Sequence, residues 1–99
     1  MLTSKQRAYL RGLANSMPVT LQIGKDGVND GVIASVNEQL EAHEMIKGKV
    51  LDNALVSART VAGEICAQTH AESVQCIGSK FVLYRPAAQK EKRKLVLPK

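Results

Sequence analysis

The chain has 99 residues, of which 44% are hydrophobic and 23% are charged, and its formal net charge is +5. This length fits one domain with a modest hydrophobic core, and the positive charge favours a polyanionic partner. Three aromatic residues, Tyr9, Phe81 and Tyr84, are too few for a site that stacks bases on aromatic rings, as RRM and OB-fold proteins do. No apolar stretch approaches the length of a membrane span, so we expect a cytoplasmic protein without a membrane partner.

Charges are segregated along the chain. Residues 1–25 carry four basic residues and no acid, whereas residues 26–44 carry five acids and no lysine or arginine. Residues 86–99 are again basic, with Glu91 as their single acid. This pattern predicts one basic face and one acidic face, although a run of charges is often only solvated surface.

Hydrophobic periodicity and capping residues divide the chain into seven elements. Asp52 and Asn53 are expected to turn the chain and cap the third helix, with Leu55 in its buried stripe. Gly78 and Ser79 fit a two-residue hairpin turn with glycine first. In chain order we predict a helix over about 4–14, a strand over 19–23, a helix over 30–43, a strand over 45–51, a helix over 54–70, and strands over 73–77 and 80–85.

This order, α-β-α-β-α-β-β, predicts a single compact domain of the α+β class. Strands separated by helices favour parallel neighbours, and the final hairpin adds an antiparallel pair. We therefore expect a mixed four-stranded sheet with helices mainly on one face and the other face open. Alternation along residues 45–51 puts Lys47 and Lys49 on one side of the strand and Ile46, Gly48 and Val50 on the other. The two lysines are expected on the open face.

The loop Gly24-Lys25-Asp26-Gly27 is the clearest candidate for a binding site. Its glycines carry no Cβ, so the backbone can turn sharply and approach another molecule closely. The helix that follows directs unpaired N–H groups and the positive end of its dipole toward the loop. Lys25 adds a cation, whereas Asp26 opposes an anion, so backbone N–H donation would have to dominate. These features predict a phosphate clamp; the alternative is a strand-to-helix turn that only needs flexible dihedral angles.

No catalytic or metal-binding pattern stands out. The loop fits neither the Walker spacing nor the dinucleotide-binding fingerprint. His43 and His70 are isolated at predicted helix ends, and Cys66 and Cys76 lack C-x-x-C spacing and fit small buried hydrophobic positions. The sequence therefore predicts a non-catalytic protein with no metal and no other cofactor.

Six short segments, at residues 2–6, 24–28, 31–32, 43–47, 77–78 and 82–86, read LTSKQ, GKDGV, GV, HEMIK, IG and VLYRP. In this order and spacing they resemble the CRM-domain family (chloroplast RNA splicing and ribosome maturation), especially its single-domain bacterial, YhbY-like members. A lone G-x-x-G is common, but the set, spread over residues 2–86, is specific. Gly48 departs from the family, whose members tend to carry a β-branched residue there, and this should loosen the strand.

The resemblance implies RNA binding by the glycine loop and the nearby basic surface, without catalysis. It implies association with a precursor of large-subunit ribosomal RNA, in a pre-ribosomal particle, during ribosome assembly. It also implies a fold similar to the C-terminal domain of bacterial translation initiation factor three. We assign residues 1–86 to a CRM-type RNA-binding domain and 87–99 to a basic, flexible tail, and expect a monomer. The expected RNA contacts are Gly24, Lys25, Asp26, Gly27, Lys5, Lys47, Lys49 and Arg85.

Two other functions fit the same sequence. In the first, the protein is an adaptor that docks a basic ribosomal protein or assembly factor on the acidic surface of the second helix, with Glu38 and Glu41 at its centre. In the second, the basic surface binds duplex DNA.

Overall fold

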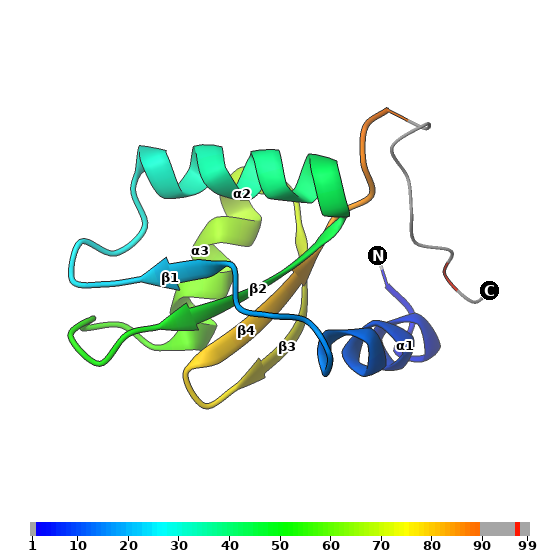
Figure 1. Cartoon of the computed structure of the whole chain (residues 1–99), viewed down its shortest axis with the longest axis horizontal. Helices are drawn as coiled ribbons and strands as arrows, with labels where there is room; N and C mark the ends of the chain where they lie inside the picture. Colours follow the sequence, from blue (N-terminus) through cyan, green and yellow to red (C-terminus); the bar gives the residue numbers. More distant parts are fainter. Residues whose placement is uncertain (1, 90–96, 98–99) are drawn as a thin grey trace.

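The computed structural model describes residues 2–89 and residue 97. The seven elements within these residues follow the predicted order (Figure 1). They are α1 Ser4–Ala14, β1 Leu21–Ile23, α2 Asp30–His43, β2 Met45–Val50, α3 Ala58–Thr69, β3 Glu72–Ile77 and β4 Lys80–Tyr84.

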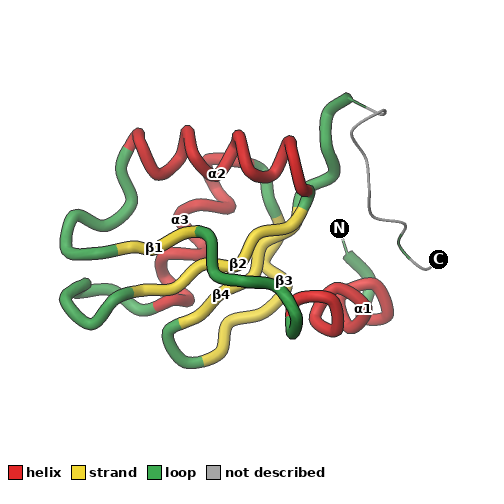
Figure 2. The backbone as a smooth tube through the Cα atoms, in the orientation of Figure 1, coloured by secondary structure: helices red, strands yellow, loops and turns green. Residues whose placement is uncertain are grey.

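The strands form one mixed sheet, which confirms the predicted fold class. Its strand order is β1-β2-β4-β3, with β1 parallel to β2 and the other two pairs antiparallel. Helices α2 and α3 pack on one face of this sheet, which we call the closed face, whereas α1 packs on the other (Figures 1 and 2).

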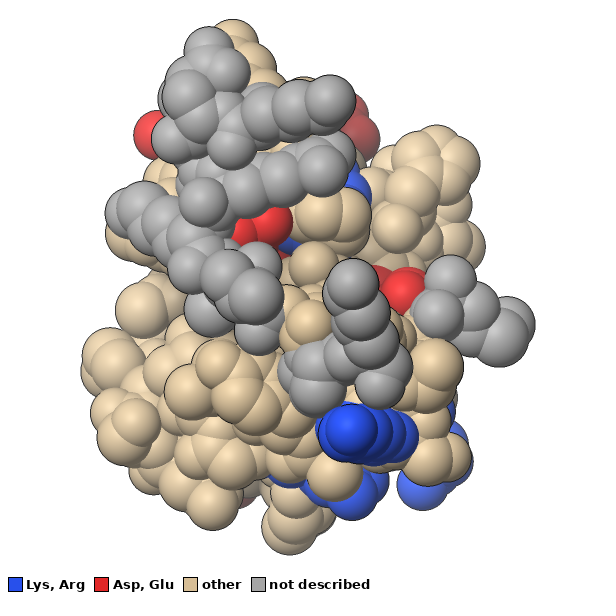
Figure 3. All heavy atoms as spheres, turned by 90° about the vertical axis from the view of Figure 1, so that its right-hand side faces the viewer, with Lys and Arg blue, Asp and Glu red and all other residues tan. Residues whose placement is uncertain are grey.

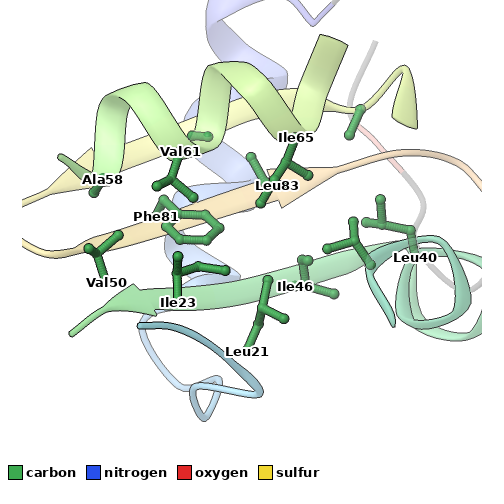
Figure 4. Close-up of a cluster of buried hydrophobic side chains, with 13 residues drawn as sticks. Leu21, Ile23, Leu40, Ile46, Val50, Ala58, Val61, Ile65, Phe81 and Leu83 are labelled. Carbon is green, nitrogen blue, oxygen red and sulfur yellow. The ribbon is translucent and has the colours of Figure 1, made fainter. Parts of the chain in front are cut away.

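The closed face holds the larger hydrophobic cluster. Figure 4 shows the Phe81 ring at its centre, with Val61 of α3 on one side and Ile23 and Val50 on the other. A Cβ built on Gly48 would lie 2.3 Å from Cζ of Phe81, far inside van der Waals contact. The Phe81 ring of β4 therefore fills the space above Gly48 that a side chain at this position would take.

The second face of the sheet is covered only in part. Leu10 and Ala14 of α1 pack with Met45, Val82 and Tyr84, which all point away from the closed face. This corrects the expectation that the second face is wholly open. The uncovered part, which we call the open face, is a row of paired residues from all four strands: Gln22, Lys49, Lys80 and Ile77.

Helix α3 begins later than predicted. Ser57 is its N-cap, with Oγ accepting a hydrogen bond from the Thr60 N–H at 3.2 Å. Ala54 instead belongs to a turn, in which its N–H donates to the carbonyl of Leu51 at 3.0 Å. The prediction of a helix from residue 54 with Leu55 in its buried stripe is wrong, because the cap that the structure uses, Ser57, lies four residues after Asn53. Leu55 is 98% exposed.

The chain after β4 turns back onto the end of α2. Glu44 ends this helix in the left-handed conformation, with φ 66°. Its carboxylate is buried and accepts a hydrogen bond from the Ala87 N–H, and the Glu41 carboxylate accepts from the N–H groups of Ala88 and Gln89. Residues 87–89 of the predicted tail thus lie against α2, and the rest of that tail, apart from residue 97, lies outside the described residues.

Candidate nucleic-acid interface

The glycine loop is a closed turn between β1 and α2. The Gly27 N–H donates to the Gly24 carbonyl at 3.0 Å, and Gly27 has φ +65°, in the left-handed region that favours glycine. Lys25 and Asp26, between them, are exposed. The backbone path therefore favours glycine at residue 27, independently of any ligand.

Helix α2 begins at Asp30, three residues after Gly27. The Asn29 side chain caps it, with Oδ1 accepting from the Val32 N–H at 2.9 Å. The N–H groups of Asp30 and Gly31 are in the first turn, where no helical acceptor exists. Since Gly31 is exposed and has no side chain, its N–H can be approached closely, although the Asp30 carboxylate in the same turn weakens the attraction for an anion.

A second loop, residues 51–57, lies beside the glycine loop (Figure 2). A Cβ on Gly24 would lie 3.6 Å from Oδ1 of Asn53, and the Leu51 N–H donates to the Ile23 carbonyl at 2.8 Å. The two loops meet because β1 and β2 are parallel, so that their carboxyl ends lie at the same edge of the sheet. The contact between the two loops was not predicted, because no local sequence pattern marks a contact between loops that follow different strands.

The two predicted lysines of β2 share one face of the strand, but their surroundings differ. Lys47 is half-buried, and its Nζ donates to the Ala14 carbonyl at the end of α1, 3.1 Å away. A cation at this position pairs with the negative end of the helix dipole. Lys49 lies two residues further along β2, directly opposite Lys80 in the antiparallel register. Lys80 was not among the predicted contacts, and only the pairing of β2 with β4 brings it to this face.

Arg85 lies at the opposite end of the sheet from the glycine loop. Its Nη1 donates to Oδ1 of Asn37 at 2.8 Å and to the Thr69 carbonyl at 2.7 Å, so the guanidinium joins α2 to the end of α3. These partly buried hydrogen bonds favour a structural role. Contact between Arg85 and RNA stays a prediction.

The remaining predicted contact, Lys5, is exposed on α1. Helix α1 lies at the opposite end of the molecule from the glycine loop (Figure 1). In Figure 3 lysine and arginine atoms gather over the α1 side, below the acidic atoms that lie toward α2. The predicted lysine contacts therefore lie in two areas, with Lys5 on α1 and with Lys25 and Lys49 around the loop and the open face.

The acidic surface of α2 is partly occupied within the chain itself. Glu38 is exposed, but both carboxylate oxygens of Glu41 accept hydrogen bonds from residues 88 and 89. This leaves less of that surface available to the adaptor function than the sequence suggested.

Cys66 is not placed as a nucleophile. Burial, followed by the nearby Cys76 and Glu72, raises the pKa of the Cys66 thiol to about 11. At neutral pH this thiol is protonated and packs against the closed-face cluster together with Cys76. Among residues 2–89 and 97, no group of three or more histidine, cysteine or acidic side chains is placed to hold a metal ion, and no helix is long and apolar enough to cross a membrane.

Comparisons with known proteins identify the family to which this chain belongs. The model of the CRS1/YhbY (CRM) domain matches residues 2–85, so the chain belongs to this family. It is 40% identical over 98 residues to the Bacillus subtilis protein named "Probable RNA-binding protein YqeI", covering 99% of this chain and 100% of that one. It is 36% identical to a Haemophilus influenzae protein named "RNA-binding protein", covering 99% and 96% of the two chains.

A solved structure shows the same architecture. The solution structure of SAV1595 from Staphylococcus aureus superposes with a TM-score of 0.77 at 38% sequence identity, covering 97% of this chain and 100% of that one. The likeness extends over nearly the whole chain.

Proposed function

We propose that this chain is a non-catalytic RNA-binding protein that holds RNA phosphates at the Gly24–Gly27 loop and the first turn of α2. The observation that carries the proposal is the closed, left-handed turn at Gly27, followed by the exposed first residues of α2, Asp30 and Gly31, whose N–H groups have no helical acceptor. Lys25 adds a cation at the tip of the turn. The names of the relatives, which describe RNA-binding proteins, support RNA as the ligand.

Asp26 and Asp30 determine how such a loop would work. Two carboxylates close to the loop oppose a phosphate, so the N–H donors and the lysines must outweigh them. Recognition would then depend on the path of the RNA backbone, because described aromatic side chains are scarce and Phe81 and Tyr84 are buried. We further propose that the RNA is a precursor of large-subunit ribosomal RNA, on the basis of the family resemblance.

Two substitutions at Gly27 test the clamp. Asparagine and aspartate have nearly the same shape, and both enter the left-handed region more readily than other residues with side chains. We expect Gly27→Asp to weaken binding to structured RNA about tenfold or more at low salt, because it adds a charge beside the phosphate, and Gly27→Asn to bind clearly better. The measurement is fluorescence anisotropy, with thermal melts to show that both variants fold. Equal affinities for the two folded variants and the unchanged protein would overturn the proposal.

The proposed RNA partner is tested by sedimentation of the tagged protein from a lysate. We expect it to comigrate with precursor large-subunit particles, less so as salt increases, and to lose the association with Gly27→Asp. Duplex DNA that competes as well as structured RNA at matched salt would favour the DNA-binding alternative. Association that survives Gly27→Asp and disappears with Glu38→Lys would contradict the clamp and support the adaptor.

A further inference from the structure

The open face places two lysines directly against each other. Lys49 of β2 and Lys80 of β4 are cross-strand partners, flanked in the same row by Gln22 and Ile77. Like charges directly opposite each other destabilise a sheet. Within the described part of the chain neither ammonium group has a hydrogen bond or ion pair, and no acid stands in this row. An anion between the two ammonium groups would remove the repulsion.

A cavity of about 160 Å³ opens beside this pair, between the end of α1 and strands β2, β4 and β3. The side-chain amides of Asn15 and Gln75 supply N–H donors, and Lys80 supplies a cation. Among the described residues, the lining of this cavity includes no carboxylate. The lining residues are Asn15, Lys47, Gln75, Ile77, Lys80 and Val82.

Lys47 contributes to this cavity in a different way. Its ammonium is held at the Ala14 carbonyl, where it offsets the negative end of the α1 dipole. Because Lys47 already offsets the negative charge at this helix end, that charge does not neutralise the nearby ammonium group of Lys80. Lys80 and Lys49 are therefore the cations available to a ligand.

We propose that this cavity and the Lys49–Lys80 pair form a second phosphate-binding subsite, for a backbone phosphate of the RNA strand held by the glycine loop. RNA as the source of the phosphate rests on the function proposed above. Ile77, which is 64% exposed, gives the subsite an apolar wall on which a ribose can pack.

The subsite lies within reach of the loop. Gln22, which is two residues before Gly24, pairs with Lys49. Neighbouring strands are about 4.8 Å apart, so β4 lies about 10 Å from β1. One RNA strand can thus reach both sites.

Titration with inorganic phosphate, followed by nuclear magnetic resonance, tests the subsite without RNA. We expect the side-chain amide signals of Asn15 and Gln75 to shift in the unchanged protein, and to shift much less in Lys80→Gln. The backbone N–H signal of Gly31 should still respond in that variant, because the loop is intact. Asn15 and Gln75 signals that do not move, or that move equally in Lys80→Gln, would overturn the subsite.

RNA binding provides the second arm. We expect Lys80→Gln to weaken binding about three- to fivefold and to reduce the slope of log affinity against log salt by about 0.7, the value for one phosphate contact on a single strand. Lys80→Arg should retain most of the affinity. Arg59→Gln, which removes the same charge from the exposed side of α3, is the matched control and should change the affinity less. Equal effects of Lys80→Gln and Arg59→Gln would overturn the proposal.

The two proposals fail in different ways. If Gly27→Asp abolishes RNA binding while Lys80→Gln has no effect, the loop clamp stands and the subsite is wrong. If phosphate shifts Asn15 and Gln75 but RNA affinity is insensitive to both Gly27→Asp and Lys80→Gln, the RNA function of the loop fails, and so does the assignment of the subsite to an RNA phosphate.

Discussion

The closed and open faces of the sheet are made by the same strands, but their side chains have different surroundings. On β2, Ile46 and Val50 enter the closed-face cluster, whereas Lys49 between them points to the open face. Alternation with a period of two lets one strand serve a core and a charged surface together. The comparison indicates that substitutions on the closed face should change the free energy of unfolding, and those on the open face should change RNA affinity.

The largest expected effect is on the closed face. Gly48→Val should lower the free energy of unfolding by about 3 kcal/mol, because its side chain would overlap the Phe81 ring and the cluster cannot expand freely. Urea denaturation measures this change. The double variant Gly48→Val with Phe81→Leu should recover part of the loss, since the smaller side chain makes room. A single variant as stable as the unchanged protein would show that the ring moves aside at little cost.

Substitution of Arg85 tests whether a cation held by internal hydrogen bonds contributes to the stability of the fold rather than to RNA binding. Arg85→Met should lower the free energy of unfolding by about 1–3 kcal/mol, because Asn37 and the Thr69 carbonyl lose their donor. We expect the folded variant to bind RNA within about twofold of the unchanged protein, since removal of one distant charge has only a small effect. Arg59→Met, at an exposed position of α3, is the control for stability. A stable Arg85→Met that binds RNA poorly would support the sequence-based prediction that Arg85 contacts RNA.

A matched pair of lysine substitutions shows which of the two basic areas contributes more to RNA affinity. Lys49→Gln should weaken RNA binding about three- to fivefold, whereas Lys5→Gln on α1 should have a smaller effect, because a single exposed charge far from the loop contributes little. Anisotropy titrations at several salt concentrations measure both. If Lys5→Gln is as damaging as Lys49→Gln, the RNA also covers the α1 area, as the sequence predicted.

The smallest effect concerns Cys66, whose thiol packs against the closed-face cluster. Because its pKa in the folded chain is about 11, above the ordinary value of 9.0, folding favours the protonated thiol. Its contribution to stability is therefore complete below about pH 9 and is lost as the pH rises through 11. Urea denaturation at pH 8 and pH 10 measures the loss, and Cys66→Ala is the control for other groups that titrate in this range. The same dependence on pH in Cys66→Ala would contradict this assignment.

Local features were predictable because they are decided by neighbouring residues. Asn29, a residue type that favours helix N-caps, is the cap of α2, and Gly27 has the left-handed conformation that glycine adopts freely. The period-two alternation of β2 placed Lys47 and Lys49 on one face. The order of the elements was also sufficient to predict the mixed sheet, because strands separated by helices favour parallel neighbours and the final hairpin adds an antiparallel pair.

Other features depended on which parts of the chain meet in space. Asn53 and Ser57 can both cap a helix, and the turn after β2 decided in favour of Ser57. The covering of the second face by α1 and the position of Lys80 opposite Lys49 follow from long-range packing and strand register.

The sequence by itself thus determined the strand-to-helix loop, the order of the elements and the faces of β2, because backbone dihedral preferences and side-chain alternation are local. Only the tertiary structure decided which charges are held by internal hydrogen bonds, as in Arg85, and which stay exposed, as in Lys25. That distinction depends on hydrogen-bond partners distant in the sequence, 16 and 48 residues away for Arg85, and no pattern of nearby residues records them.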